Sequence, residues 1–241
     1  MYLLIPAAGT GQRMKDAWQR QGKRQRNKLL LPLLDQSILA WTLQAAEAAG
    51  QIVWIGIVGQ PSDWPDFKDI LAPLNLNTPV VLIEGGSTRQ ESVYNGLQAL
   101  PTEARYVLIH DGARCLATPA LFDRCAEALK HSAGLIAAIP VKDTIKRVTP
   151  GTHTVESTPD RHFLWAAQTP QGFEVKQLKA CHERGRQEGW VVTDDAALFE
   201  QCSLPVTIVE GEETNLKITT PVDLAIAELI LKSRREKPSA S

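Results

Sequence analysis

The sequence has few of the features that mark a secreted, membrane-bound or zinc-binding protein. Its four cysteines form no C-x-x-C pair and its five histidines no H-x-x-x-H pair, so two common zinc-site patterns are missing. We expect Cys115, Cys125, Cys181 and Cys202 to be free thiols in a reducing compartment. No apolar run reaches the length of a membrane span, and the N-terminal run is too short for a signal peptide. The sequence therefore predicts a cytoplasmic bacterial protein, or a plastid protein whose transit peptide has been removed, with no membrane partner.

An excess of charge of one sign is also missing. With 26 Lys and Arg against 27 Asp and Glu, the net charge is −1, so no overall field attracts nucleic acid. The six tryptophans are not interleaved with basic residues, which favours packing in a core or an interface over stacking on single strands. We expect no nucleic-acid partner, and a phosphorylated ligand would have to be met by positive charge gathered locally.

The standard phosphate-binding motifs are absent, although a glycine-containing loop lies near the N-terminus. The segment "PAAGTGQRM" (residues 6–14) follows an apolar run, but a dinucleotide fingerprint would need a third glycine where this segment ends in methionine, and no Walker A sequence exists. Gly9 and Gly11 either allow a tight strand-to-helix turn or present backbone N–H groups to an anion. Arg13 and Lys28, two cations beyond the glycines, favour a cradle for a triphosphate.

Short apolar runs alternate with helical patterns along the chain, which predicts a mainly parallel, doubly wound α/β sheet in a single domain over residues 1–241. Most of the runs are continuously apolar, as in strands buried on both faces. The predicted strands are Tyr2–Ala7, Ile52–Val58, Pro79–Ile83, Tyr106–His110, Leu135–Val141 and Val206–Val209. The predicted helices are Ser37–Ala49, Arg89–Leu100, Pro119–Lys130, Val175–Glu188, Asp194–Gln201 and Pro221–Arg234. Ligands are expected at the carboxyl ends of the strands.

One stretch, residues 142–168, interrupts this alternation. It has no helical stripe and reads as a β-hairpin with a turn near Pro150-Gly151. Inside an α/β rhythm such a hairpin should project as an arm, and an isolated hairpin is only marginally stable in water. We therefore expect the arm to pair with a second copy of the chain and form a homodimer.

Two further loops follow predicted strands. Asp111, in "HDGAR", stands at a strand end, where it is either a Mg²⁺ ligand or a turn-forming aspartate. The segment "EGGSTRQESV" (residues 84–93) carries a glycine pair and opens a helix, with Thr88 and Glu91 spaced as a capping box. Together with the N-terminal loop, these loops can meet at one crevice, and that convergence favours a ligand site over three separate turns.

The motifs stand in the order found in one enzyme family. The chain resembles the 2-C-methyl-D-erythritol 4-phosphate cytidylyltransferases from Leu3 to about Leu231, in "PAAGTGQRM", "NKLLLPL", "GGSTRQESV", "HDGAR", "VKDTIKR", "TPQGF", "TDDA" and "NLKITTPVDLAIAE". The resemblance implies a Rossmann-like nucleotidyltransferase fold and a Mg²⁺-dependent enzyme of isoprenoid precursor synthesis. Its substrates would be CTP and methylerythritol phosphate, and its products CDP-methylerythritol and pyrophosphate.

The resemblance also implies roles for individual residues. Arg13 and Lys28 would contact the CTP phosphates and stabilise the pentacoordinate α-phosphate, while Lys217 and Arg161 would hold the methylerythritol phosphate, and Asp111 would hold Mg²⁺. The nucleotide site would further include Ala7, Ala8, Gly9, Gly11, Gly86, Arg89 and Ser92. The acceptor site would further include Thr144, Thr169, Thr193 and Arg114. For Arg114 a bracing contact with Asp111 is an equally open interpretation.

The sequence departs from the family pattern mainly in the long basic spacer between Arg13 and Lys28. Lys23, Arg24 or Arg26 could take the place assigned to Lys28, and the spacer is either a mobile solvated segment or a lid over the CTP phosphates. Two alternatives to the implied function remain at this point. One is a pyrimidine nucleotidyltransferase for another polyol phosphate, such as ribitol phosphate, and the other is a non-catalytic nucleotide-binding module.

Overall fold

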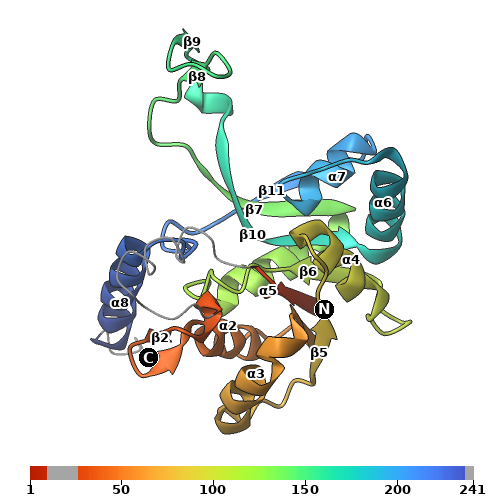
Figure 1. The fold of residues 1–241 in the computed structure, drawn as a ribbon, viewed down its shortest axis with the longest axis vertical. Helices are drawn as coiled ribbons and strands as arrows, with labels where there is room; N and C mark the ends of the chain where they lie inside the picture. Colours follow the sequence, from red (N-terminus) through yellow and green to blue (C-terminus); the bar gives the residue numbers. More distant parts are fainter. Residues whose placement is uncertain (10–26, 237–241) are drawn as a thin grey trace.

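A computed structural model describes residues 1–9 and 27–236. Its centre is a seven-stranded sheet with the order β11-β7-β10-β6-β1-β4-β5 (Figure 1). All neighbouring strands are parallel except β10, which runs antiparallel to both β6 and β7. The strands are β1 (Tyr2–Pro6), β4 (Trp54–Gly59), β5 (Val80–Glu84), β6 (Tyr106–Ile109), β7 (Gly134–Pro140), β10 (Trp165–Glu174) and β11 (Thr207–Glu210).

Helices pack on both faces of this sheet, as the sequence predicts for a doubly wound fold. Along β1, Leu3 and Ile5 belong to one buried cluster and Leu4 to another, because alternate side chains of a strand point to opposite faces. The first cluster takes residues from α2 (Ile38–Glu47), α3 (Trp64–Leu71), α5 (Pro119–Ala128) and α8 (Pro221–Glu236). The second takes residues from α4 (Arg89–Gln98), α6 (Val175–Glu188) and α7 (Asp195–Gln201).

The helix starts near the carboxyl ends of the strands are capped by side chains. Thr88 Oγ1 accepts the Glu91 N–H at 3.0 Å, so the predicted cap of α4 is confirmed, while the Glu91 carboxylate accepts the N–H of Ser87. Helix α8 is capped by Thr220 and Asp223. Thr220 Oγ1 accepts the Asp223 N–H and Asp223 accepts the Thr220 N–H, which is the reciprocal pattern of a capping box.

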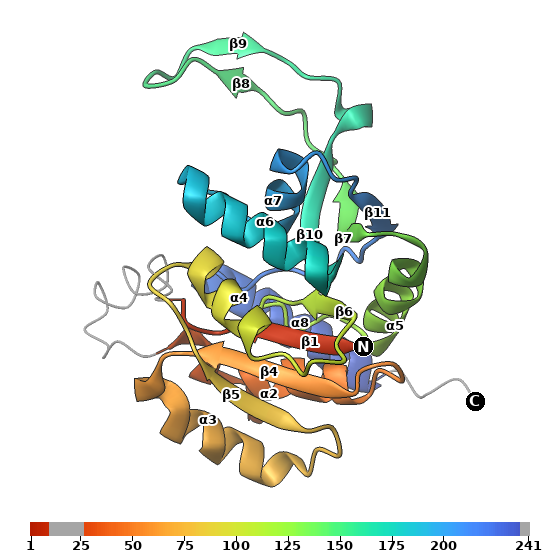
Figure 2. The same ribbon diagram turned by 90° about the vertical axis from the view of Figure 1, so that its right-hand side faces the viewer.

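The predicted hairpin is present and projects from the body as strands β8 (Arg147–Val148) and β9 (Val155–Ser157) (Figures 1 and 2). Its turn contains Gly151 at φ 76°, a conformation that favours glycine. The predicted limit of residues 142–168 is wrong at its C-terminal end. From Trp165 onward the chain is β10, and Trp165 pairs with Pro140 of β7.

Two elements are missing from the sequence-based prediction. β10 contains Pro170 and Gly172, residues that argue against a central strand, and its register with β7 shifts between Ala167 and Gln171. Helix α3 buries Phe67 and packs Trp64, Ile70 and Leu71, each partly buried, on the same cluster. With eight residues it is too short for this apolar face to stand out from the sequence. The remaining short elements are β2 (Pro32–Leu33), β3 (Gln36–Ser37), η1 (Lys28–Leu30), η2 (Pro61–Asp63), η3 (Ala72–Leu74), η4 (Leu129–His131) and η5 (Arg161–Phe163). Among the helices described, none is long and apolar enough to cross a membrane.

Phe67 should be the main anchor of α3 on the sheet, since the other apolar side chains of this helix are only partly buried. Its ring is fully buried and lies where a Cβ on Gly59 of β4 would stand, 2.5 Å from Cε2. We expect Phe67→Ala to lower the free energy of unfolding by about 3–5 kcal/mol, as for other buried phenylalanines. Urea unfolding measures this, with the exposed Asp69→Ala on the same helix as control, expected within about 0.5 kcal/mol of wild type. A loss below about 1 kcal/mol for Phe67→Ala would show that α3 is held by other contacts.

Candidate active site

A cavity of about 300 Å³ opens where β1, β5 and β6 end. The loops that follow these strands all contribute to its wall, so the predicted convergence of the three loops is confirmed. Backbone bonds hold the starts of two of these loops on β4, since Ala7 N–H donates to Val58 O and Gly85 N–H to Gly59 O. The cavity is lined by Pro6, Ala7, Ala8, Gly9, Asn27, Lys28, Leu29, Gly86, Ser87, Thr88, Arg89, Ser92, Asp111, Gly112, Ala113 and Lys217.

Lys28 is fixed at the cavity by its neighbour Asn27. The Asn27 amide donates to Ala7 O at 2.9 Å and to Asp63 at 2.8 Å, and its carbonyl accepts the Leu29 N–H. These bonds hold the start of η1 against the end of β1. The Lys28 ammonium donates to Ile218 O at 3.0 Å, which places it beside the segment that carries Lys217. Of the predicted cradle, Gly11 and Arg13 lie outside the described residues, as do the alternatives Lys23, Arg24 and Arg26.

The loop after β5 is shaped by Ser92. This residue is 1% exposed, and its hydroxyl accepts the Gly86 N–H at 3.0 Å and donates to Thr88 O at 2.8 Å. A Cβ on Gly85 would stand 2.6 Å from the Cβ of Ala8, so glycine allows the loops after β1 and β5 to touch. Ser92 and Gly86 thus form a rigid wall of backbone at the cavity.

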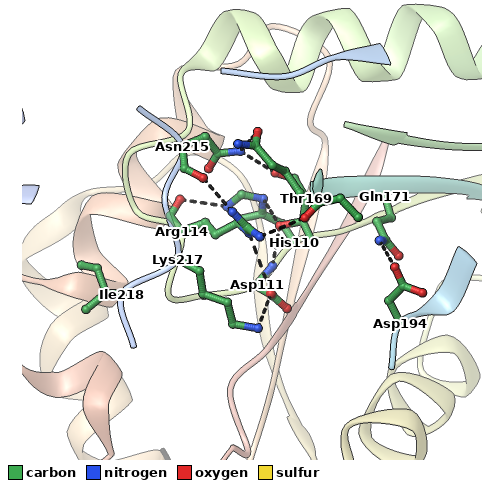
Figure 3. A network of polar contacts seen from close by, with 12 residues as sticks. His110, Asp111, Arg114, Thr169, Gln171, Asp194, Asn215, Lys217 and Ile218 are labelled. Carbon is green, nitrogen blue, oxygen red and sulfur yellow. Dashed lines mark hydrogen bonds and ion pairs between the residues drawn. The ribbon is translucent and has the colours of Figure 1, made fainter. Parts of the chain in front are cut away.

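Asp111 is surrounded by cations. Its carboxylate lies 2.7 Å from Lys217 Nζ, 3.6 Å from Arg89 Nε and 3.9 Å from Arg114 Nε. Figure 3 shows Lys217 and Arg114 beside it. Burial by itself would raise the pKa of Asp111, but Lys217, Arg89 and Arg114 hold it far below its usual value. Among the described lining residues it is the one carboxylate, and it is ionised at neutral pH. The side chain can therefore offer an oxygen to a divalent cation.

Arg89 is held from both sides. Its guanidinium lies 2.8 Å from Asp195 as well as 3.6 Å from Asp111, and Asp195 in turn lies 3.3 Å from the buried ring of His182. Burial favours the neutral form of Arg89, yet Asp195 and Asp111 raise its pKa above the usual value. Sequence reasoning missed Asp195 and His182 as parts of the site, although Asp195 lies in the quoted "TDDA" motif.

The residues predicted for the acceptor fall into two groups. Thr169 and Arg114 pack behind Asp111: the Thr169 hydroxyl accepts the Asp111 N–H, and Arg114 donates to Asn215 O at 2.7 Å and to Ala167 O at 3.3 Å. Arg114 thus makes the bracing contact that the sequence left open. Thr193 is exposed in the bend before α7. Thr144 and Arg161 are exposed on the arm, where Arg161 donates to Lys142 O, and in this single chain none of the three lines the cavity.

His110 is fully buried next to Asp111, with its ring 4.8 Å from that of Phe122. Burial lowers its pKa to about 4, so the ring is neutral at physiological pH. Its nitrogens contact Thr169 Oγ1 at 3.0 Å and Arg114 O at 3.1 Å. The ring is fully buried and does not line the cavity, so it cannot act there as a general base.

The comparisons with known proteins decide the family. The sequence model of 2-C-methyl-D-erythritol 4-phosphate cytidylyltransferase matches residues 1–233. The chain belongs to this family. It is 66% identical over 234 residues to the Nostoc punctiforme protein of that name, covering 97% of this chain and 99% of that protein, and 65% identical over 239 residues to the Acaryochloris marina protein, covering 99% and 97%.

Solved structures agree with the family assignment. The chain superposes on 4-diphosphocytidyl-2C-methyl-D-erythritol synthase from Anaerococcus prevotii with a TM-score of 0.82 at 31% identity, covering 96% of this chain and 97% of that one. On the cytidylyltransferase from Thermus thermophilus the TM-score is 0.75 at 32% identity, covering 96% and 98%. The predicted family, the α/β nucleotidyltransferase fold and the reaction class are thereby confirmed.

The charge cluster makes a prediction about stability and pH. Because the pKa of Asp111 is lower in the folded chain than in the unfolded one, its ion pairs stabilise the fold fully above about pH 5 and lose this effect as pH falls below about 4. We expect Asp111→Asn to cost about 3 kcal/mol at pH 7, the lower end of the cost of breaking a buried ion pair, since the cations that it leaves uncompensated are only partly buried. The cost should become progressively smaller below pH 4. Urea unfolding from pH 3 to 7 tests this, and a cost that does not change with pH would contradict it.

Proposed function

We propose that this chain transfers the cytidylyl group of CTP to 2-C-methyl-D-erythritol 4-phosphate, releasing pyrophosphate, with the residues around the Asp111 cavity as its active site. The observation that carries the site assignment is that, among the described residues, Lys28, Arg89 and Lys217 line one cavity of about 300 Å³ together with a single carboxylate, Asp111, which pairs with two of them. The product, CDP-methylerythritol, belongs to the isoprenoid precursor pathway. The cyanobacterial origin of close relatives supports a cytoplasmic or plastid location.

The chemistry asks for cations between two anions. A phosphate oxygen of the acceptor attacks the α-phosphate of CTP, and both partners are negatively charged, so positioning and charge stabilisation are the main tasks of the protein. Lys28, together with Arg13, would hold the triphosphate and stabilise the pentacoordinate α-phosphate. Lys217, next to the Ile218 carbonyl that Lys28 contacts, would hold the phosphate of the acceptor with Arg161. The nucleophile is already ionised, so no general base is needed.

The small residues would form the nucleotide site. Ala7, Ala8 and Gly9 leave room for the ligand to approach the backbone, as would Gly11. Gly86 presents backbone at the cavity wall and Ser92 fixes its orientation, which supports a place beside cytosine and ribose, with Arg89 facing the phosphates. Thr144, Thr169, Thr193 and Arg114 remain proposed acceptor contacts.

The donor set fits a magnesium ion of the kind that binds with phosphates. Mg²⁺ uses one or two carboxylates, several waters and substrate phosphate oxygens, and no cluster of three or more metal-binding side chains occurs among the described residues. Asp111 supplies one ionised carboxylate, and its partner Lys217 is 39% exposed on the side chain, which leaves it free to turn to a phosphate. When bound, the ion would neutralise charge on the triphosphate.

The arm supports a homodimer. It exposes apolar side chains that a lone chain leaves in water, with exposed fractions of 47% for Val148, 53% for Val155 and 83% for Phe163. Covering these side chains with a second copy would remove that apolar area from water. The same pairing would bring Arg161 and Thr144, which lie away from the cavity of their own chain, to the cavity of the second copy.

Kinetics of single variants test the assignment of the two cations. With CTP, methylerythritol phosphate and Mg²⁺ we expect pyrophosphate release, and Lys28→Ala should lower kcat/KM for CTP by about 10²–10³ because it removes charge stabilisation at the α-phosphate. Lys217→Ala should instead raise KM for methylerythritol phosphate and leave CTP binding near wild type. The exposed Lys68→Ala is the control. Equal turnover with ribitol phosphate would overturn the acceptor assignment, and no release with either acceptor would favour a nucleotide-binding module.

Mixed dimers test whether the arm completes the neighbouring site. Lys28→Ala and Arg161→Ala homodimers should both be nearly inactive. In a heterodimer of the two, a shared site combines Lys28 of one chain with Arg161 of the other, so one site is intact and about half the wild-type activity returns. Pyrophosphate release by the doubly tagged heterodimer measures this. No recovery, or a monodisperse dimer in light scattering after deletion of the arm, would contradict the shared site.

A further inference from the structure

The His110 ring lies behind Asp111, and its partners determine which atom donates in each of its hydrogen bonds. Arg114 O can only accept, so the Nε2 of the neutral ring carries the proton and donates to it at 3.1 Å. Nδ1 is then a bare lone pair and accepts from the Thr169 hydroxyl at 3.0 Å. With its proton committed, Thr169 Oγ1 accepts the N–H of Asp111 at 3.0 Å.

Together these hydrogen bonds hold both ends of the turn that carries Asp111. The loop begins at Asp111 and turns back at once, since Arg114 N–H donates to Asp111 O at 2.9 Å. Both ends of this turn are bonded to the His110 ring, one directly and one through Thr169 of β10 (Figure 3). His110 is itself fixed, because its backbone N–H donates to Leu4 O of β1 and its ring packs on Phe122.

The same loop holds the segment of Lys217. Ala113 O accepts the N–H of Ile218 at 2.9 Å, next to the lysine whose ammonium meets the Asp111 carboxylate at 2.7 Å. A shift of the loop would therefore move the proposed magnesium ligand and its cationic partner together. His110 cannot reach a ligand itself, since it is 0% exposed.

We propose that His110 is a positioning residue for the transfer reaction: through the Arg114 carbonyl and the Thr169 hydroxyl it holds Asp111 where magnesium and CTP bind together. The inference rests on the proposed function. It assigns the polar contacts of a buried histidine that would otherwise be counted as packing alone. It also means that the Thr169 hydroxyl already holds the Asp111 backbone before an acceptor binds.

Calorimetric titration with CTP, in Mg²⁺ and in EDTA, separates positioning from packing without any turnover. His110→Phe keeps an aromatic ring against Phe122 and loses both hydrogen bonds. We expect it to reduce the gain in CTP affinity that Mg²⁺ provides by about 10-fold, the usual effect of removing a partner behind a metal ligand, while affinity in EDTA stays near wild type. Thr169→Val, which breaks the same chain at its next link, should show the same direction of change.

Phe122→Leu is the matched control. It disturbs the packing of the His110 ring and leaves its hydrogen bonds in place, so it should lower the melting temperature and keep the Mg²⁺-dependent gain. If Phe122→Leu reduces the gain as much as His110→Phe, or if Thr169→Val and a folded His110→Phe both keep it, the positioning role is overturned.

Asp111→Asn in the same titration distinguishes a failure of the proposed magnesium site from a failure of the positioning role of His110. Loss of the gain in Asp111→Asn together with a reduced gain in His110→Phe supports both the site and the positioning role. Loss in Asp111→Asn alone overturns the positioning role and keeps the proposed site. A full gain in Asp111→Asn overturns the magnesium site, and with it the role of His110.

Discussion

The site depends on one largely buried carboxylate among three cations. Lys217, Arg89 and Arg114 each direct a charged group at Asp111, at 2.7, 3.6 and 3.9 Å. Without a counter-ion these cations would repel one another in a poorly hydrated pocket. Asp111 thus allows positive charge to be gathered in advance where a chain with a net charge of −1 offers no general field for anions. Preorganised charge of this kind is what phosphoryl and nucleotidyl transfer requires.

The antiparallel strand β10 provides hydrogen-bond partners for the two segments that carry Asp111 and Lys217. At its register shift, Gln168 accepts from Glu212 N–H and donates to Glu212 O, while the Asn215 amide donates to Thr169 O. The segment leading to Lys217 is thereby bonded to β10, just as the segment beginning at Asp111 is bonded to it through Thr169. A purely parallel sheet would bring the strand ends together but would lack this strand running back through the middle of the site.

Local pattern and long-range contact explain which features the sequence predicts. Continuous apolar runs identify β1, β5 and β6, and the residues after them are placed correctly at one cavity because parallel strands end at one edge. β10 is invisible to the same reasoning, since Pro170 and Gly172 contradict strand propensity and tertiary pairing overrides it. The Arg89–Asp195 pair joins residues more than a hundred positions apart, and its geometry follows only from the packing of α4 against α6 and α7.

The three cations around Asp111 differ in solvent exposure, and this difference separates the two that are fixed from the one that can exchange Asp111 for a ligand. Arg114 is 13% exposed and bonded to two backbone carbonyls, and Arg89 is shared with a buried carboxylate, so neither can follow a ligand without leaving a buried group unpaired. Lys217 is 39% exposed and meets Asp111 through its flexible end. Exchanging that carboxylate for a phosphate replaces one ion pair by another at small cost, which makes Lys217 the cation best suited to an incoming anionic substrate.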